Sequence, residues 1–243
     1  MKTFYYILFS FSLILFSCKK ENMNDCVKST GEIITEHRAV NDFDSILVHN
    51  NITLYLKYDS VSSIVVEAGK NLVPLVETSI ENNKLIIRNN NRCNFMRSYK
   101  PPVNVIVSIS DLKHLNLAGS GDIFSLNTLV LERVRMVNSG IGDINLEIDA
   151  GYLYTQIYGS GGINLSGKAA VSEIYSTGNC FMQCENLVTG YTYLHSNTTG
   201  NIYVNVEKEL GVNIIGSGDV YYLGKPDITK LNITGKGTLK NLN

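Results

Sequence analysis

The chain has no tryptophan, only four prolines and four histidines, and little charge for its 243 residues. Charged residues make up 18% and apolar residues 44%, a balance that indicates a folded core rather than extended disorder. The net charge of −1 gives no electrostatic indication of nucleic-acid binding, and we expect no nucleic-acid partner. Asparagine is abundant instead, at 27 residues, and because it suits turns but not helix interiors, a helical bundle is excluded as well.

Long hydrophobic runs are also absent. The one extended apolar stretch, Phe4–Phe16, is interrupted by Ser10 and Ser12 and is too short to cross a bilayer core of about 30 Å as a helix. Its position behind Lys2 is typical of a secretory signal. We therefore expect an exported protein without a transmembrane span.

The signal ends in Leu15-Phe16-Ser17-Cys18, which resembles a bacterial lipobox although Phe16 is bulkier than the usual residue. This pattern predicts a lipoprotein signal peptide over residues 1–17 and a lipidated Cys18 that anchors the protein to the outer membrane. The polar residues 18–30 are then a flexible tether. The alternative is an ordinary signal peptide with an unmodified Cys18.

The other four cysteines divide into two pairs. Cys26 and Cys93 lie in polar, loop-like sequence, and export permits a disulfide between them that would contribute about 4 kcal/mol. Cys180 occupies an apolar position, where a free cysteine packs as a small hydrophobic residue. Zinc is disfavoured at Cys180 and Cys184 because no further ligand stands near them in the sequence.

A glycine-rich motif recurs through residues 111–243. Most motifs contain two glycines, and the second glycine, for example Gly121, Gly178 or Gly200, serves to measure the spacing. Successive second glycines are 17 to 22 residues apart, a period that indicates stacked repeat units. The motif residues are Gly119, Gly121, Asp122, Gly140, Gly142, Asp143, Gly159, Gly161, Gly178, Gly200, Gly216, Gly218 and Asp219.

Apolar residues alternate with polar ones on both sides of each motif, as at Leu115 and Leu117 before it and Ile144 and Leu146 after it. This period of two predicts strands, and units of about nineteen residues leave no room for a helix. Units stacked about 4.8 Å apart form an all-β, right-handed parallel β-helix. Residues 31–110 also alternate but lack the motif, so they are expected to form an irregular β N-terminal part that caps the solenoid.

The motif residues have structural roles in this interpretation. The glycines permit a positive φ at a tight corner, and the acidic residue bonds amides in its own turn. Stacking would align Asp122, Asp143, Gly162, Asn179, Asn201, Asp219 and Thr238 in one column. This mixed composition favours turn caps over calcium ligands.

The sequence resembles the family described as putative auto-transporter adhesin, head GIN domain. The resemblance rests on the lipobox, the repeated turns, the segment Gly216–Pro226 and the tripeptide Gly162-Ile163-Asn164, and covers roughly residues 40–240. It implies a β-helical fold and export in Gram-negative bacteria, and it supplies no catalytic residues.

Four aromatic residues occupy outward positions just after the motif: Phe124, Phe181, Tyr203 and Tyr221. Cross-strand packing on a solvated sheet is the favoured interpretation, and a face that binds a glycan or an envelope protein is the other.

The sequence contains few residue patterns that indicate catalysis. No nucleophile elbow, P-loop or dinucleotide fingerprint occurs, and Glu173 and His195 are the one ionisable pair expected to be neighbours. We therefore predict no catalytic residue, cofactor or metal, and a non-catalytic cell-envelope lipoprotein that acts as an adhesin-like binding or structural module. The alternative is a polysaccharide lyase or hydrolase on the same scaffold.

The lipid anchor is directly testable. Replacing Cys18 with Ser removes the only thiol at the lipobox, so the mutant protein should leave the membrane fraction while the unmodified protein stays there. A Cys18→Ser protein that still fractionates with membranes, combined with an intact mass of the unmodified protein that shows no acyl chain, would disprove lipidation.

Overall fold

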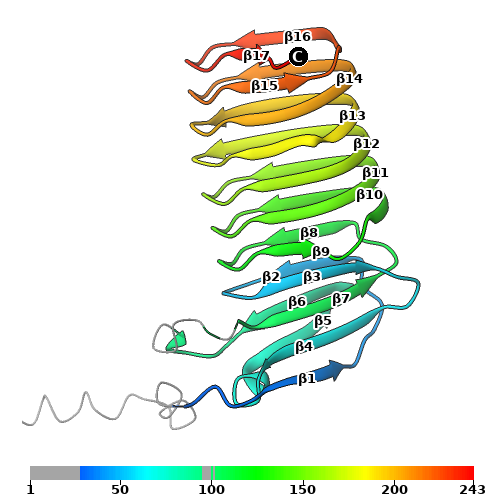
Figure 1. Cartoon of the computed structure of the whole chain (residues 1–243), viewed down its shortest axis with the longest axis vertical. Coiled ribbons are helices and arrows are strands. Elements are labelled where there is room, and N and C mark those ends of the chain that lie inside the picture. Colours follow the sequence, from blue (N-terminus) through cyan, green and yellow to red (C-terminus); the bar gives the residue numbers. More distant parts are fainter. Residues whose placement is uncertain (1–27, 95–99, 101) are drawn as a thin grey trace, which may run out of the picture.

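The computed structural model describes residues 28–94, 100 and 102–243, which form a tall column of stacked strands (Figure 1). Seventeen strands of this part join in one continuous sheet. They are β1 (Ile33–Arg38), β2 (Ser45–Val48), β3 (Thr53–Tyr58), β4 (Ser63–Gly69), β5 (Val76–Glu81), β6 (Lys84–Asn89), β7 (Asn104–Ile109), β8 (His114–Leu117), β9 (Ile123–Ser125), β10 (Leu129–Asn138), β11 (Ile144–Ile157), β12 (Ile163–Gly178), β13 (Met182–Thr198), β14 (Ile202–Ile214), β15 (Val220–Leu223), β16 (Asp227–Ile233) and β17 (Leu239–Asn241). A short 3₁₀ helix, η3 (Val73–Leu75), precedes β5. None of the helical residues described here forms a segment long and apolar enough to cross a membrane.

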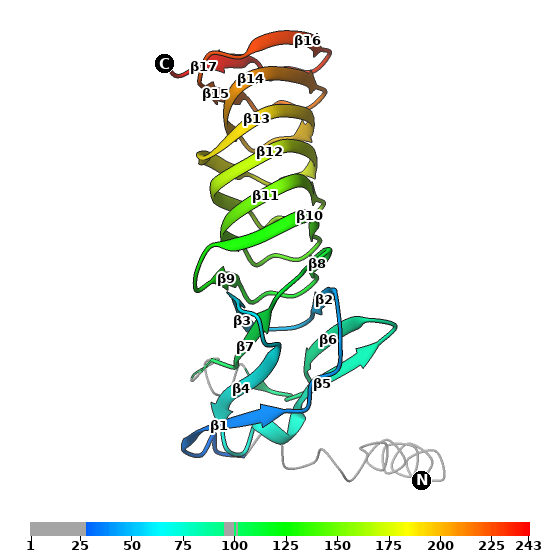
Figure 2. The ribbon, with the colours of Figure 1, turned by 90° about the vertical axis from the view of Figure 1, so that its right-hand side faces the viewer.

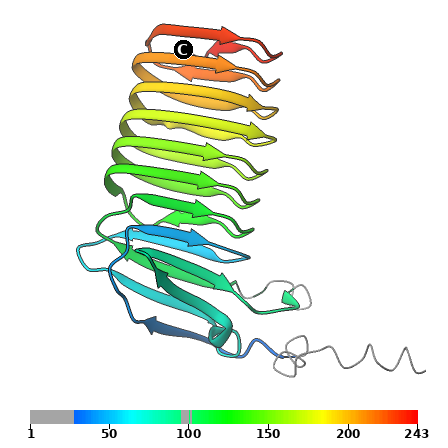
Figure 3. The same cartoon turned by 180° about the vertical axis from the view of Figure 1, so that it is seen from behind.

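The predicted parallel β-helix is confirmed. From β8 onward the strands pair in parallel, and partners such as Ile144 and Ile163 are 17 to 21 residues apart in the sequence. Each coil has two straight segments, joined by a tight turn at one edge of the column and by a gradual bend at the other (Figures 1 and 3). The motif turns therefore stack along a single edge.

Like residues stack in columns inside the solenoid because side chains alternate inward and outward along every strand. The column just after the turn is buried from Leu54 to Val220 and becomes partly exposed at Leu239 in the last coil. Its members, in register order, are Leu54, Ile123, Ile144, Ile163, Met182, Ile202, Val220 and Leu239. Such columns make up the hydrophobic core.

The solenoid continues below residue 111, where the repeat was expected to begin. β2 lies in parallel between β8 and β6, and β3 lies in parallel between β9 and β7. Their turn carries Asn50, at a φ of 60°, and the Asn50 carbonyl lies directly beneath Gly119. The glycine motif did not reveal this coil in the sequence because asparagine takes the place of glycine in its turn. At the base of the column the pairing is antiparallel: β1 pairs with β4, β4 with β7, and β5 with β6 (Figure 2).

The motif glycines are required for a reason that differs from the expected one. Only Gly178 among them has a positive φ, at 99°. At Gly142 a Cβ atom would overlap the carbonyl oxygen of Gly121, and at Gly161 it would overlap that of Gly142. At Gly142 and Gly161 glycine is needed because the backbone of the neighbouring coil lies too close for a side chain.

The structure also corrects the alignment of the fourth motif. Gly178 stacks on the first glycine of the preceding turn, Gly159, while Cys180 lies beneath Gly200 in the column of second glycines. Counting through Cys180 changes the gaps of 17 and 22 residues to 19 (161 to 180) and 20 (180 to 200). The repeat is thus more regular than the glycines alone indicate.

The cysteines of the described part differ in state. Cys180 and Cys184 are buried free thiols, and burial raises the pKa of Cys184 to about 12, so it stays protonated. Cys93 is disulfide-bonded. Cys18, Cys26 and the signal peptide also lie outside them, so the lipidation and the Cys26–Cys93 pairing stay predictions.

The close approach of the turns predicts a large effect from a single methyl group. Gly142→Ala should destabilise the fold by about 1–3 kcal/mol, because the new Cβ overlaps a backbone oxygen that cannot rotate away. Ser160→Ala, at an exposed position of the next turn, is the control and should be nearly neutral. The measurement is the urea unfolding midpoint, and equal midpoints for the two variants would disprove steric exclusion.

Candidate functional site

The acidic turn residues connect successive coils. One carboxylate oxygen of Asp122 accepts a hydrogen bond from the backbone N–H of Asp143 at 2.9 Å, and Asp143 accepts one from the N–H of Gly162 at 2.7 Å. The prediction that these side chains bond amides of their own turn is wrong. They bond the next turn instead, which makes them a ladder along the edge of the column.

Phe181, not Asn179, occupies the fourth coil's position in this ladder. The N–H of Ile163 donates to the Phe181 carbonyl, as the N–H of Ile144 donates to that of Gly162. A Cβ atom at Gly162 would overlap the Phe181 ring, so the ring lies over that glycine. Phe181 is therefore a turn residue with an exposed ring, and the predicted position just after the turn belongs to Gln183 in this coil.

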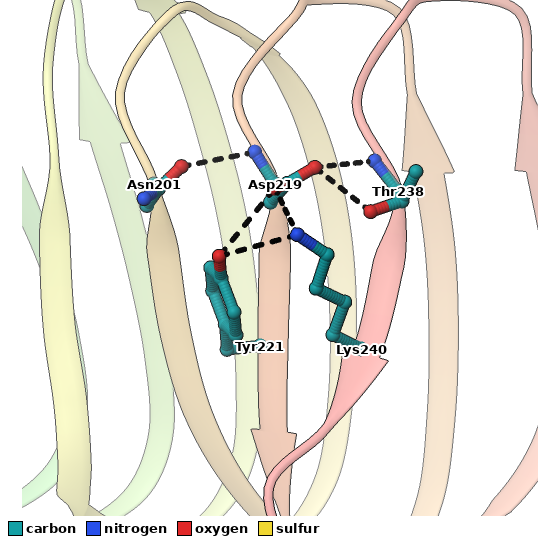
Figure 4. A network of polar contacts seen from close by, with 5 residues as sticks. All are labelled: Asn201, Asp219, Tyr221, Thr238 and Lys240. Carbon is teal, nitrogen blue, oxygen red and sulfur yellow. Dashed lines mark hydrogen bonds and ion pairs between the residues drawn. The ribbon is translucent and has the colours of Figure 1, made fainter.

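The ladder ends in a polar cluster around Asp219 (Figure 4). One carboxylate oxygen accepts hydrogen bonds from the N–H and the hydroxyl of Thr238, both at 2.8 Å, and the other lies 2.6 Å from Lys240 Nζ. The bonds from Lys240 and Thr238 lower the pKa of Asp219 to about 2. Asn201 accepts from the N–H of Asp219 at 3.1 Å and links this cluster to the coil below.

An outward row runs along the face that follows the turns. We call it the outer row, and its members in register order are Tyr55, Phe124, Asn145, Asn164, Gln183, Tyr203, Tyr221 and Lys240. The predicted residues Phe124, Tyr203 and Tyr221 all belong to it. The structure thus places three of the four predicted aromatic residues in a single line.

The outer row has aromatic ends and a polar middle. Tyr55 stacks on Phe124 with ring centroids 5.8 Å apart, and Tyr203 stacks on Tyr221 at 4.7 Å with an angle of 9° between the planes. Between these pairs a shallow groove of about 360 Å³ is lined by amide, hydroxyl and carboxylate side chains. The polar lining residues are Ser125, Asn145, Glu147, Asn164, Ser166, Gln183, Glu185 and Asn186.

The opposite straight segment carries a second exposed face, whose arginines the sequence interpretation missed. Arg133 lies over the Tyr152 ring at 4.6 Å, and Arg135 lies over the Tyr154 ring at 5.0 Å. Tyr154 in turn stacks on Tyr175 at 5.4 Å. We call these five residues the arginine–tyrosine face. Burial raises the pKa of the Tyr152 phenol to about 12, and the nearby Glu173 carboxylate adds to the shift, so the phenol stays a neutral donor.

Glu173 and His195 are not neighbours, contrary to prediction. The ring of His195 stacks on Tyr175 at 5.8 Å, and its Nδ1 lies 2.9 Å from the Asn213 amide nitrogen. Glu173 pairs in register with Tyr154 and Tyr193 instead. The error has the same source as the misaligned fourth turn, which shifted β12 by two residues.

Metal-ligating side chains do not cluster in the part of the chain that the structure describes. No three His, Cys, Asp or Glu side chains come together there as metal ligands would. His114 and His195 lie on β8 and β13, four coils apart, or about 19 Å along the axis.

Stacked coils joined at Gly-rich turns define a β-solenoid with two exposed faces. A sequence model of the putative auto-transporter adhesin, head GIN domain, family matches residues 42–226, and the chain belongs to that family. A search of curated proteins gives no match.

Solved structures share the fold. A putative adhesin from Bacteroides fragilis is 21% identical, with a TM-score of 0.77 over 87% of this chain and 97% of its own. A putative adhesin from Parabacteroides distasonis is 19% identical, with a TM-score of 0.68 over 87% and 98%. A putative lipid binding protein from the same species is 21% identical, with a TM-score of 0.67 over 88% and 98%.

The Asp219 cluster predicts a specific acid response. Because the folded-state pKa of about 2 lies below the ordinary value of 3.8, the stabilisation is fully present above about pH 4 and is lost as the pH falls toward 2. Thermal unfolding across this range should therefore show a smaller loss for Asp219→Asn than for the unmodified protein. Asp149→Asn, which breaks an exposed ion pair with Lys168, is the control and should behave as the unmodified protein. Identical acid responses of all three proteins would refute the role of Asp219.

Proposed function

We propose that the protein is an exported, lipid-anchored binding module of the bacterial cell envelope, with an adhesin-like and non-catalytic role. The observation that carries this proposal is the outer row, whose stacked aromatic pairs flank a groove lined by amides. Aromatic rings and amides are the groups with which proteins contact sugars and partner surfaces. The family description and the neighbours described as putative adhesins support the same role.

The scaffold favours binding because it fixes the row before any ligand arrives. Each member of the row sits on a strand paired within the sheet, so little conformational freedom is lost on contact. From Phe124 to Tyr203 the row covers four coil steps, or about 19 Å. We infer that the ligand is extended, either a glycan chain or a strip of an envelope protein.

A glycoside hydrolase on the same scaffold is the second candidate, and one observation favours it. Glu147 and Glu185 both line the groove, and their strands are two steps apart, about 9.6 Å, near the separation of inverting carboxylate pairs. Glu185 Oε2 is buried and has no hydrogen-bond partner among the described residues. Thr128, however, donates to Glu147 at 2.6 Å, which holds that carboxylate in a structural contact.

The test is a binding screen against glycans and envelope fractions. Tyr203→Ala combined with Tyr221→Ala should weaken binding about tenfold or more, because each ring is a large rigid contact. Tyr193→Ala, at an exposed ring on the opposite face, is the matched control and should bind normally. Undiminished binding by the double variant would contradict the proposal. Release of sugar reducing ends that disappears in Glu185→Gln would favour the hydrolase.

A further inference from the structure

A column of basic side chains extends below the arginine–tyrosine face. Lys84, Ser45, His114 and Arg135 take the same outward register position in four successive coils. Lys84, His114 and Arg135 are exposed, and at about 4.8 Å per coil they span about 14 Å of the axis. Glu173 takes this position two coils above Arg135, so the basic stretch has a defined upper limit.

Arg133 widens this column at its upper end. Arg133 and Arg135 are two residues apart on β10, and each guanidinium is held against a tyrosine ring of the next coil. Within the described residues, neither guanidinium has a carboxylate within ion-pair distance. The Arg135 guanidinium donates only to the neutral side chain of Gln156, at 2.8 Å. Stacking fixes the plane of each guanidinium and leaves N–H groups at its edges for a ligand.

Two adjoining hollows, of about 460 and 420 Å³, provide space beside these charges. Both are lined by His114 and Arg135. Asp111 and Glu132 line the larger hollow, together with Lys113, which is already paired with Asp44 at 3.0 Å. In the larger hollow these two carboxylates offset the two arginines. The smaller hollow is lined by Lys84, His114 and Arg135 and by no carboxylate, so it is the one that faces the basic column.

We propose that Lys84, His114, Arg133 and Arg135 form a second site, separate from the outer row, that binds an acidic polysaccharide through its carboxylate or sulfate groups. Guanidinium forks match such oxyanions in bidentate geometry. A polymer fits better than a single ion because Lys84 and Arg135 lie three coil steps apart, about 14 Å along the axis, with His114 between them.

This surface is less suited to a peptide ligand than to a sugar chain. Strand β10 has a free edge over Leu129–Val134, where it pairs with β11 alone. From Arg135 onward it is paired on both sides, as are β8 and the start of β6, so no edge is free for strand addition beside Lys84, His114 and Arg135. Tyr152 and Tyr154 add ring edges and phenol groups beside the arginines, which suits a sugar chain that carries both hydroxyl and acidic groups.

The experiment is titration calorimetry of the purified protein with polygalacturonate and with heparin, which separate carboxylate from sulfate recognition. Binding to at least one is expected, and it should weaken with salt because the charges are exposed. Fully methyl-esterified polygalacturonate, which lacks the charge, should not bind. Arg133→Ala combined with Arg135→Ala should reduce affinity about tenfold or more, since two charge-assisted contacts are lost.

A variant with Lys225→Ala and Lys236→Ala removes the same charge from exposed positions near the C-terminal end and is the matched control. It should bind within about twofold of the unmodified protein, and a melting temperature for each variant verifies folding. The proposal is overturned if neither acidic polymer binds, if the esterified polymer binds equally, or if both double variants lose affinity alike. If the protein bound phosphatidylglycerol vesicles through these arginines but bound neither acidic polymer, the site would be assigned to lipid headgroups and the proposal would be overturned as well. Loss of acidic binding in the Tyr203→Ala, Tyr221→Ala variant would place the ligand on the outer row instead.

Discussion

The rest of the structure depends on how closely the backbones of successive coils approach one another at the turns. The carbonyl oxygen of one turn occupies the space that a side chain of the next turn would need, as at Gly121 beneath Gly142. This contact fixes the stacking distance and register at one edge of the column. The parallel strands continue this register from β10 to β12, and it shifts at bulges where β12, β13, β14 and β16 pair. The apolar columns fill the interior.

That constraint also determines how binding surfaces can be built. Residues about nineteen apart become direct neighbours, so a surface is a set of columns and not a cluster of loops. The stacked pair Tyr203 and Tyr221 and the pairs of Arg133 with Tyr152 and Arg135 with Tyr154 all arise in this way. Because the strands that carry these residues are already fixed, stacking orders the two side chains of each pair with little further loss of conformational entropy.

The sequence was sufficient to predict the fold class, because alternation and a period near nineteen both reflect the strand geometry directly. It was not sufficient to align the fourth turn, because Gly178 and Asn179 imitate the motif although counting nineteen residues from Gly161 reaches Cys180. The direction in which Asp122 and Asp143 bond could not be read either, since it depends on which amide of the next coil faces the carboxylate.

Three of the eight members of the outer row were found from sequence because they follow the motif directly. The arginine–tyrosine face lies farther from the motif. A signal for that face does exist. Arg133 and Arg135, shifted by nineteen residues, fall on Tyr152 and Tyr154, and a search of the repeat for such column pairs would have found them.

Amide hydrogen exchange measures the coil-to-coil contacts at the turns most directly. If the turns are closed as described, the N–H groups of Asp143, Gly162 and Thr238, each donated to a carboxylate of the preceding coil, should exchange as slowly as those of the flanking strands. Fast exchange at these three amides, with slow exchange in the strands on either side, would show that the turns are open loops and that the register is set elsewhere.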